Sequence, residues 1–331
     1  MSLIEVKNLT KEFPLGFLGR IKLKAVDNVS FELDESKLIS LIGESGSGKT
    51  TIGKLILRLL KPTGGQIIFN GKDIKTFKPK DYYRNVQGIF QDPYSSFNPV
   101  YKIDRIFELV FDEFMPQLQR NQRQKEIEEI LISVGMNPSQ ILGKYPHQLS
   151  GGQLQRILIA RTLLLKPKVL IADEIISMLD ASTRVDILSF LGELKQKGMS
   201  VIFITHDLSF GYYISDETII LYKGSIMEMG DTIKVFHNPM HPYTRMLLES
   251  VPSIEKKWDL GRFFVPETVH KEISGCKFYE RCSEATDECK RQVPQLVEME
   301  ENHKVACIKS HSSARTERKS FESSHKSDSV G

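Results

Sequence analysis

Gly43-Glu44-Ser45-Gly46-Ser47-Gly48-Lys49-Thr50 is the stretch of this sequence that decides the fold. It fits the phosphate-binding pattern G-x-x-x-x-G-K-[ST], whose glycines let consecutive backbone N–H groups point inward at an anion. The apolar residues 38–42 predict a buried strand before this loop, and residues 50–60 predict a helix after it. The helix N-terminus adds free N–H donors to the phosphate site. Lys49 can then reach the β- and γ-phosphates of a nucleotide, while the Thr50 hydroxyl can hold Mg²⁺.

A second apolar run, Val169-Leu170-Ile171-Ala172-Asp173, ends in an acid and is followed by Glu174. The carboxyl ends of parallel strands meet at one edge of a sheet, so Asp173 is expected beside the phosphate loop, where it can orient Mg²⁺. Glu174 could polarise a water molecule for attack on the γ-phosphate. A strand that ends in two acids is usually only a strand end, but the phosphate loop upstream favours the catalytic interpretation.

Two further polar residues follow predicted strands. His206 comes directly after the apolar run 201–205, and Gln91 follows the predicted strand at 86–90. At the same sheet edge, the histidine would reach the γ-phosphate and hold the attacking water, and the glutamine could touch both the metal and the water. Each signal is weak alone, because a lone histidine there is more often structural and surface glutamines are common.

Leu149-Ser150-Gly151-Gly152-Gln153 is a separate glycine-rich turn between these motifs. With it, the complete order of motifs resembles the nucleotide-binding subunit of an ABC transporter over roughly residues 3–252. The resemblance implies a P-loop ABC ATPase domain with ATP and Mg²⁺ as bound groups. It consists of a mostly parallel sheet, a β subdomain and a helical signature subdomain at about 93–160.

The resemblance also implies roles for individual residues. Glu174 stands at the position of the catalytic glutamate, His206 at that of the switch histidine and Gln91 at that of the Q-loop glutamine. Thr50, Gln91 and Asp173 are the implied Mg²⁺ ligands. The residues implied to contact nucleotide are Phe13, which would stack on adenine, and Gly43, Glu44, Ser45, Gly46, Ser47, Gly48, Lys49, Thr50, Thr51, Gln91, Asp173, Ser150, Gly151, Gly152, Gln153 and Asp180.

Ser150 is a good helix N-cap, and Gly151-Gly152-Gln153 opens a helix that runs on through 154–165. This N-terminus is a second anion site that has no phosphate of its own. In the family that the chain resembles, it faces the ATP held by a second ABC ATPase subunit. We expect such a pair here and favour a paralogue over a second copy of this chain.

The run Glu174-Ile175-Ile176-Ser177-Met178-Leu179-Asp180 departs from the family pattern, which has proline and threonine after the glutamate and then Ser-Ala-Leu-Asp. The acids and the serine are present, so the D-loop position at 177–180 and hydrolysis are still expected. The bulkier side chains put the rate and its coupling in doubt.

Composition limits the partners. The net charge of +3 comes from 45 basic and 42 acidic residues, which is too balanced for general nucleic-acid binding. The sequence has no run of 18 apolar residues, and residues 1–5 enter a mixed strand without a signal peptide. We therefore expect a peripheral subunit at the cytoplasmic face of the membrane. It would work with two membrane permease subunits and, indirectly, with an extracytoplasmic substrate-binding protein.

Two segments indicate which group of ABC transporters the chain resembles. Asn238-Pro239-Met240-His241-Pro242-Tyr243-Thr244 and Gln91-Asp92-Pro93-Tyr94-Ser95-Ser96-Phe97-Asn98-Pro99 resemble oligopeptide and dipeptide importers, whose relatives include oligosaccharide importers. Residues 253–310 are expected to form a small C-terminal extension, and the polar residues 311–331 a disordered tail.

All four cysteines lie in that extension, at Cys276, Cys282, Cys289 and Cys307, with the spacing C-x5-C-x6-C-x17-C. A cytosolic location argues against disulfides, and zinc sites usually contain C-x₂₋₄-C pairs. The looser spacing suits a [4Fe–4S] cluster, and the extension resembles that of peptide-importer ATPases, where such a cluster is found. Zinc and the absence of any metal stay open as alternatives.

The sequence thus predicts an ATP-hydrolysing subunit that energises import of peptides or oligosaccharides. A soluble ABC-type ATPase in DNA repair or translation is one alternative. The absence of a long coiled-coil insertion and the tail at 241–244 weigh against it. A weakly hydrolysing regulatory subunit of a heterodimer is another, which the intact Lys49, Asp173, Glu174 and His206 disfavour.

Overall fold

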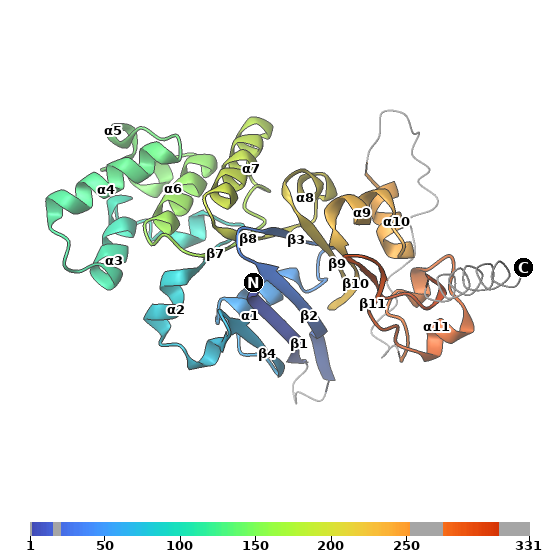
Figure 1. Ribbon diagram of the computed structural model, residues 1–331. Coiled ribbons are helices and arrows are strands. Elements are labelled where there is room, and N and C mark those ends of the chain that lie inside the picture. The colour runs from blue at the N-terminus through green and yellow to red at the C-terminus, as the bar shows by residue number, and fades with distance from the viewer. Residues whose placement is uncertain (1, 16–20, 252–273, 311–331) are drawn as a thin grey trace, which may run out of the picture.

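A largely parallel sheet of eight strands forms the centre of the computed structural model, which describes residues 2–15, 21–251 and 274–310 (Figure 1). Its strand order is β11-β12-β10-β9-β3-β8-β7-β6, and β3 runs parallel to β8 and β9. This confirms the predicted α/β class. The strand bounds are β3 Leu38–Ile42, β6 Val86–Ile89, β7 Val169–Asp173, β8 Ser200–Thr205, β9 Glu217–Tyr222, β10 Ser225–Asp231, β11 Val297–Glu300 and β12 His303–Val305.

A second, antiparallel sheet has the order β2-β1-β4-β5. Its strands are β1 (Ser2–Leu15), β2 (Ile21–Asp34), β4 (Gly64–Phe69) and β5 (Lys72–Asp73). Helix α1 (Lys49–Ile56) lies between the two sheets, because its Ile52 shares one buried cluster with Val6 of β1 and Ile171 of β7. The short helix α2 (Pro79–Asn85) leads into β6. The helix that carries the phosphate loop is thus held from both sides.

The opposite face of the main sheet carries a helical layer, seen in the upper left of Figure 1. Alternate residues of β7 and β8, such as Leu170 and Phe203, join its apolar cluster. In α4, Ile127 and Leu131 are buried and Ile130 is partly buried, as expected for a stripe that packs into a core. The helices are α3 Asp104–Phe114, α4 Arg120–Ser133, α5 Pro138–Ile141, α6 Gly151–Leu163, α7 Ala181–Gln196 and α8 Leu208–Ile214.

The C-terminal residues join the main sheet. β12 pairs antiparallel with β10, with Glu228 opposite Val305, and β11 then pairs with β12. Helices α9 (Thr232–His237), α10 (Pro242–Glu249) and α11 (Asp287–Arg291) complete this end. The predicted boundary at 252/253 and the predicted tail at 311–331 fall outside the described residues. None of the helices described is long and apolar enough to span a membrane.

Candidate nucleotide-binding site

The loop at 43–50 connects β3 to α1, as the sequence predicts. Gly48 is the N-cap of α1 with φ 101°, a left-handed value that favours glycine, and a Cβ at this position would collide with the backbone oxygen of Ala25 in β2. The Lys49 Nζ donates to the carbonyl oxygens of Gly43 at 2.7 Å and Glu44 at 2.9 Å. The lysine thus folds back over its own loop, in the space where a phosphate would compete for its ammonium group.

Thr50 and Asp173 meet at the carboxyl end of β7. The Thr50 hydroxyl donates to Asp173 Oδ1 at 3.1 Å, which brings together two of the oxygen groups predicted to hold Mg²⁺. Burial raises the pKa of the Asp173 carboxyl, and burial lowers the pKa of the Lys49 ammonium. A site that contains a buried cation beside a buried carboxylate suits a bound polyanion with a divalent metal ion.

Glu174 has φ 50°, a left-handed backbone value that is unusual for a residue with a side chain. Its N–H donates to Ile204 O at 2.9 Å, and its carbonyl oxygen accepts from Ser177 N at 3.1 Å. The strained turn directs its carboxylate to His206, whose Nδ1 lies 3.3 Å from Glu174 Oε1. The structure therefore brings the two predicted polar residues of neighbouring strands β7 and β8 together.

The residues that depart from the family pattern have a packing explanation. Ile175 and Ile176 are 1% and 3% exposed and belong to the apolar cluster under the helical layer, whereas Met178 is 59% exposed. Asp180 caps α7 by accepting from Thr183 N at 3.0 Å. Hydrogen bonds from Ser182 and Thr183 hold the pKa of the Asp180 carboxyl well below its usual range. The two isoleucines thus point into the core while Met178 stays at the surface, and the loop is anchored by its capped helix.

Ser150 caps α6 in a complete capping box. Its hydroxyl accepts from Gln153 N at 3.2 Å, and Gln153 Oε1 accepts from Ser150 N at 2.9 Å. A Cβ on Gly152 would lie 3.3 Å from Thr183, so the glycine lets α6 and α7 approach closely. Ser150 is exposed and the hydrogen bonds of this motif stay within its own helix. The predicted residues 150–153 therefore form a preformed helix terminus.

Gln91 and Phe13 occupy the positions that the strands predict. Gln91 lies exposed just beyond β6, which is the neighbour of β7 in the sheet. Phe13 is half-buried in β1 opposite Leu23, with Lys11 Nζ 5.0 Å from its ring centroid. Because Ala25 of the same hairpin contacts Gly48, Phe13 lies on the strand pair that borders the phosphate loop.

The four cysteines line one cavity of about 20 Å³ together with His241 and Phe278. They are free thiols, and burial raises the pKa of Cys276 to about 11. Within the described residues, no group of three or more His, Cys, Asp or Glu side chains is arranged to hold a metal ion. The four cysteines therefore lie around one cavity, but their side-chain geometry is not that of a metal site.

Sequence reasoning missed two residues at the phosphate loop. Arg281 makes a bidentate ion pair with Glu44, and the hydroxyl of Tyr243 accepts from Glu44 N at 3.1 Å. Both residues belong to the C-terminal part of the chain. The sequence separation from Glu44 is more than 190 residues, so no local pattern could reveal either contact.

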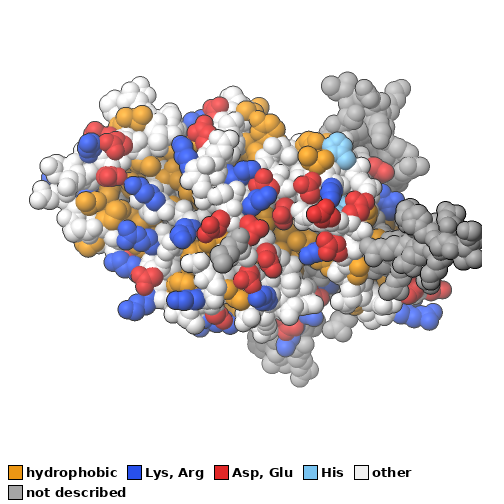
Figure 2. Space-filling model, in the orientation of Figure 1, with side chains coloured by type: hydrophobic (Ala, Val, Ile, Leu, Met, Phe, Trp, Pro, Cys, Tyr) orange, Lys and Arg blue, Asp and Glu red, His pale blue; other side chains and the backbone are white. Residues whose placement is uncertain are grey.

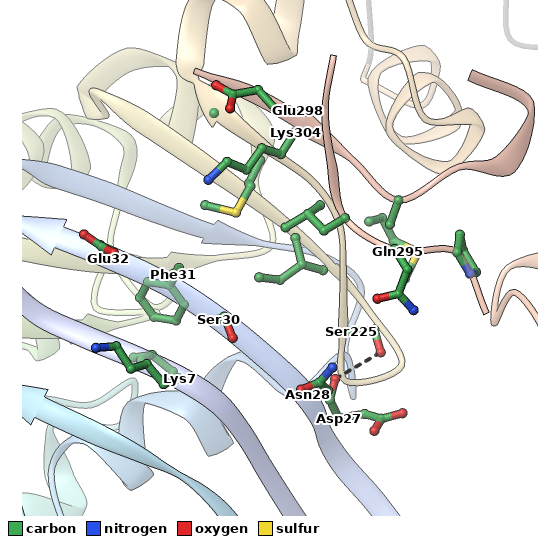
Figure 3. Close-up of a pocket in the computed structure, with 18 of the residues that line it drawn as sticks. Lys7, Asp27, Asn28, Ser30, Phe31, Glu32, Ser225, Gln295, Glu298 and Lys304 are labelled. Carbon is green, nitrogen blue, oxygen red and sulfur yellow. Dashed lines mark hydrogen bonds between the residues drawn. The ribbon is translucent and has the colours of Figure 1, made fainter. Parts of the chain in front are cut away.

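Another cavity among the described residues lies away from this loop. It has about 890 Å³ and lies between β2, β10 and the C-terminal residues around Gln295, Glu298 and Lys304 (Figure 3). Figure 3 shows Asp27 and Ser225 at one end of this cavity, where the Ser225 hydroxyl donates a hydrogen bond to the Asp27 carbonyl oxygen. Its lining has both acidic and basic side chains and contains none of the predicted nucleotide or catalytic residues.

Two family models match separate parts of the chain. Residues 26–177 match the ABC transporter family, and residues 227–289 match the oligopeptide/dipeptide transporter C-terminal region. The chain is 39% identical to the oligopeptide transport ATP-binding protein AppF of Bacillus subtilis (strain 168), over 92% of this chain and 97% of that protein. It is 38% identical to the putative oligopeptide transport ATP-binding protein YkfD of the same organism, over 93% and 95%.

The chain is also similar in fold to solved structures of ATP-binding cassettes. The ATP-binding cassette MJ0796, in a dimeric post-hydrolysis state with ADP and Pi, has a TM-score of 0.62 and 26% identity, over 69% of this chain and 98% of that chain. The fold is also similar to that of cbiO1 from Clostridium perfringens, with a TM-score of 0.61 and 24% identity over 72% of this chain and 91% of that chain.

Proposed function

The chain belongs to the family of ATP-binding subunits of oligopeptide/dipeptide-type ABC transporters, and from this membership we propose that it hydrolyses ATP to drive peptide import through separate membrane subunits. It is an ABC-type ATPase. The observation that carries the proposal is the meeting of Thr50, Asp173, Glu174 and His206 at one sheet edge, next to Lys49.

In the proposed site, Lys49 binds the β- and γ-phosphates, and Thr50, Asp173 and Gln91 hold Mg²⁺, which would offset the charge that develops on the phosphates. Glu174 accepts the proton of the attacking water, and His206 holds that water near the γ-phosphate. The 3.3 Å contact between Glu174 and His206 supports this division of roles. Phe13 stacks on adenine, and its place on the hairpin beside Gly48 supports that role.

We assign the terminus of α6 at 150–153 and Asp180 to the ATP that a second ABC ATPase subunit holds. The capping box leaves helix N–H groups available for an anion from outside the chain. The solved structure of MJ0796, a similar ATP-binding cassette, is dimeric and holds ADP and Pi. A paralogue is our preferred partner, and a second copy of this chain is the alternative.

The remaining partners follow from the importer assignment. Since no described helix can span a membrane, two permease subunits would supply the channel, and an extracytoplasmic binding protein would deliver the cargo. The chain itself would lie at the cytoplasmic face. Acidic and basic side chains are intermixed over the face in Figure 2, which is unlike a nucleic-acid-binding surface. The C-terminal match at 227–289 favours an importer over DNA repair or translation.

For the C-terminal residues we propose a [4Fe–4S] cluster held by Cys276, Cys282, Cys289 and Cys307, with zinc as the alternative. Two observations support it. The four cysteines lie around one cavity, and the sequence has no cysteine outside residues 276–307. Binding would need thiolates, so the side chains would have to turn inward from the positions described above. The cluster is assigned a structural role.

The function can be tested on the native complex. The tagged chain would be purified from its own membranes and every associated chain identified by mass spectrometry. ATP hydrolysis would then be measured with binding protein loaded with peptides or with oligosaccharides. We expect two permease chains, a second ATPase chain and stimulation by peptides, while Lys49→Ala abolishes hydrolysis. Co-purification with repair or translation factors in place of permeases would contradict the importer assignment.

A further inference from the structure

We propose that Arg281 is a positioning residue of the nucleotide site, which neutralises and holds the carboxylate of Glu44 so that the phosphate loop can accept a triphosphate. This inference rests on nucleotide binding at residues 43–50. It is argued from the contacts of Arg281 and Lys277 and from no metal bound by the cysteines.

The contact between the two residues is a two-pronged ion pair. Arg281 Nη1 donates to Glu44 Oε2 at 2.7 Å, and Arg281 Nη2 donates to Glu44 Oε1 at 2.8 Å. The guanidinium also lies 5.7 Å from the ring centroid of Tyr222 and 5.9 Å from that of Phe278. Two aromatic rings and two hydrogen bonds thus fix the orientation of the fork, so the pair is better ordered than an ordinary surface ion pair.

Glu44 needs such a partner because of where it lies. It is the second residue of the phosphate loop, and its carbonyl oxygen accepts from Lys49 Nζ at 2.9 Å. Its side chain is 38% exposed. A free carboxylate at this position would repel the phosphates and compete with them for the lysine ammonium. Pairing with Arg281 removes the net charge, because both carboxylate oxygens accept from the guanidinium.

A second contact anchors the same C-terminal segment close to the loop. Lys277 Nζ lies 2.9 Å from Asp27 Oδ2 and donates to Lys223 O at 2.8 Å. The adjacent Gly224 N donates to Ser47 O in the phosphate loop at 3.0 Å. Lys277 follows Cys276, and Arg281 precedes Cys282. The order of the cysteine-containing segment therefore determines whether Arg281 can reach Glu44.

Equilibrium nucleotide binding to the full-length chain tests the proposal. Arg281→Ala should raise the Kd for ATP about tenfold and the Kd for ADP less, because ADP has one negative charge fewer. The difference in Kd for ATP between the variant and the unaltered chain should shrink at high salt, because salt screens partly exposed charges. The matched control is Arg291→Ala, which removes the same charge from an exposed position in the same segment and should leave both Kd values unchanged.

The double variant Arg281→Ala/Glu44→Gln separates the charge effect from a loss of structure. Without the carboxylate there is nothing to neutralise, so its Kd for ATP should return to within about threefold of the unaltered chain. Arg281→Lys, which keeps the charge but loses the fork, should bind ATP with an intermediate Kd.

Equal weakening for ATP and ADP, or no recovery in the double variant, would overturn the proposal. An Arg281→Ala chain that binds ATP as tightly as the unaltered chain would overturn it too, with the nucleotide function intact. If the unaltered chain itself bound no ATP, the proposed function would fail together with this inference.

Discussion

Asp173 and Glu174 are adjacent in the sequence, yet the backbone gives them different surroundings. Asp173 ends a buried strand and accepts a hydrogen bond from Thr50. The left-handed backbone at Glu174 turns the next carboxylate toward His206 instead. The two neighbouring acids can therefore serve different purposes, Asp173 near the metal position and Glu174 near the water. The left-handed φ of Glu174 is what turns its side chain in a different direction from that of Asp173.

Glu174→Gln tests this separation at the level of one atom. The amide keeps the size of the side chain but cannot accept the proton, so hydrolysis by the assembled complex should fall on the order of 10²–10⁴-fold. ATP binding should persist, since Lys49 and Thr50 are unchanged, and the paired, ATP-bound state should accumulate. Turnover and size-exclusion profiles with ATP would be measured, and Glu288→Gln, at an exposed position, is the control. Turnover like that of the unaltered protein would remove Glu174 from the role of base.

For single residues, the sequence predicts the contacts that a motif or the order of strands implies. The proximity of Thr50 and Asp173 was expected, because the carboxyl ends of parallel strands meet at one edge of the sheet, and the phosphate loop follows β3 at that edge. The pair Arg281–Glu44 was not, because two residues 237 positions apart share no periodicity or motif. The burial of Ile175 and Ile176 could not be predicted either, since the pattern of a loop does not say which side chains point inward.

Among the elements, α6 shows how a helix terminus can be built for a group outside the chain. Its capping box satisfies donors at Ser150 and Gln153, and Gly152 allows close approach to α7. The remaining N–H groups of the first turn have no intrahelical partners, as in any helix. Sequence reasoning predicted where this helix begins, because an N-cap serine is a local signal, whereas the helix ends at Leu163 and not at the predicted 165.

Ser150→Arg tests the shared site. A bulky side chain would replace the cap at the start of α6, so hydrolysis of the ATP held by the partner subunit should be impaired. Nucleotide binding to this chain should stay nearly intact, because the loop at 43–50 is unchanged. Both would be measured, by single-turnover hydrolysis in the complex and by equilibrium binding to the isolated chain. Isolated monomers that hydrolyse ATP as fast as the full complex would contradict a shared site.

The elements β10, β12 and α10 meet at one buried acid. Glu228 is fully buried and accepts from Met240 N at 2.8 Å, from His241 N at 3.0 Å and from His303 Nε2 at 2.7 Å. The residues 238–244, which the sequence singled out, thus form the turn that Glu228 holds. Their role in the structure is to join the core sheet to the C-terminal strands.

Glu228→Ala should destabilise the chain by about 3 kcal/mol, because it leaves the buried N–H of His241, the partly buried N–H of Met240 and the His303 side chain without an acceptor. Chemical denaturation followed by circular dichroism would measure the loss. Glu288→Ala, at an exposed position in the same part of the chain, should change the stability by less than about 0.5 kcal/mol. Similar midpoints for the two variants would show that the buried acid does not hold these elements together.

For the whole molecule, the main finding is that the C-terminal residues are continuous with the ATPase core. β12 extends the main sheet through β10, and Tyr243, Lys277 and Arg281 contact the phosphate loop or its supports. The parallel core strands were predictable from their apolar runs. The addition of β12 was not, since β12 is short, mixed in polarity and far in sequence from β10.

The last prediction concerns what holds this C-terminal end together. Few apolar residues lie between Cys276 and Cys307, so the segment can build little core of its own, and a metal–thiolate centre at the shared cavity would supply the missing order. Protein purified without oxygen should be brown and contain about four iron and about four sulfide ions per chain, as a Cys₄ cubane requires.

Cys282→Ser should bleach the colour and loosen residues 274–310, as measured by hydrogen exchange, while nucleotide binding at Lys49 persists with a weakened affinity, because Arg281 is next to the altered residue. Ser283→Ala, at the exposed neighbouring position, should leave the colour and the exchange rates unchanged. Colourless anaerobic protein with one zinc ion per chain would replace the cluster by zinc but keep the metal site. Protein with no metal and four freely reactive thiols would contradict both, and the pairing of β12 with β10 and the contacts of Lys277 and Arg281 would then have to order the segment.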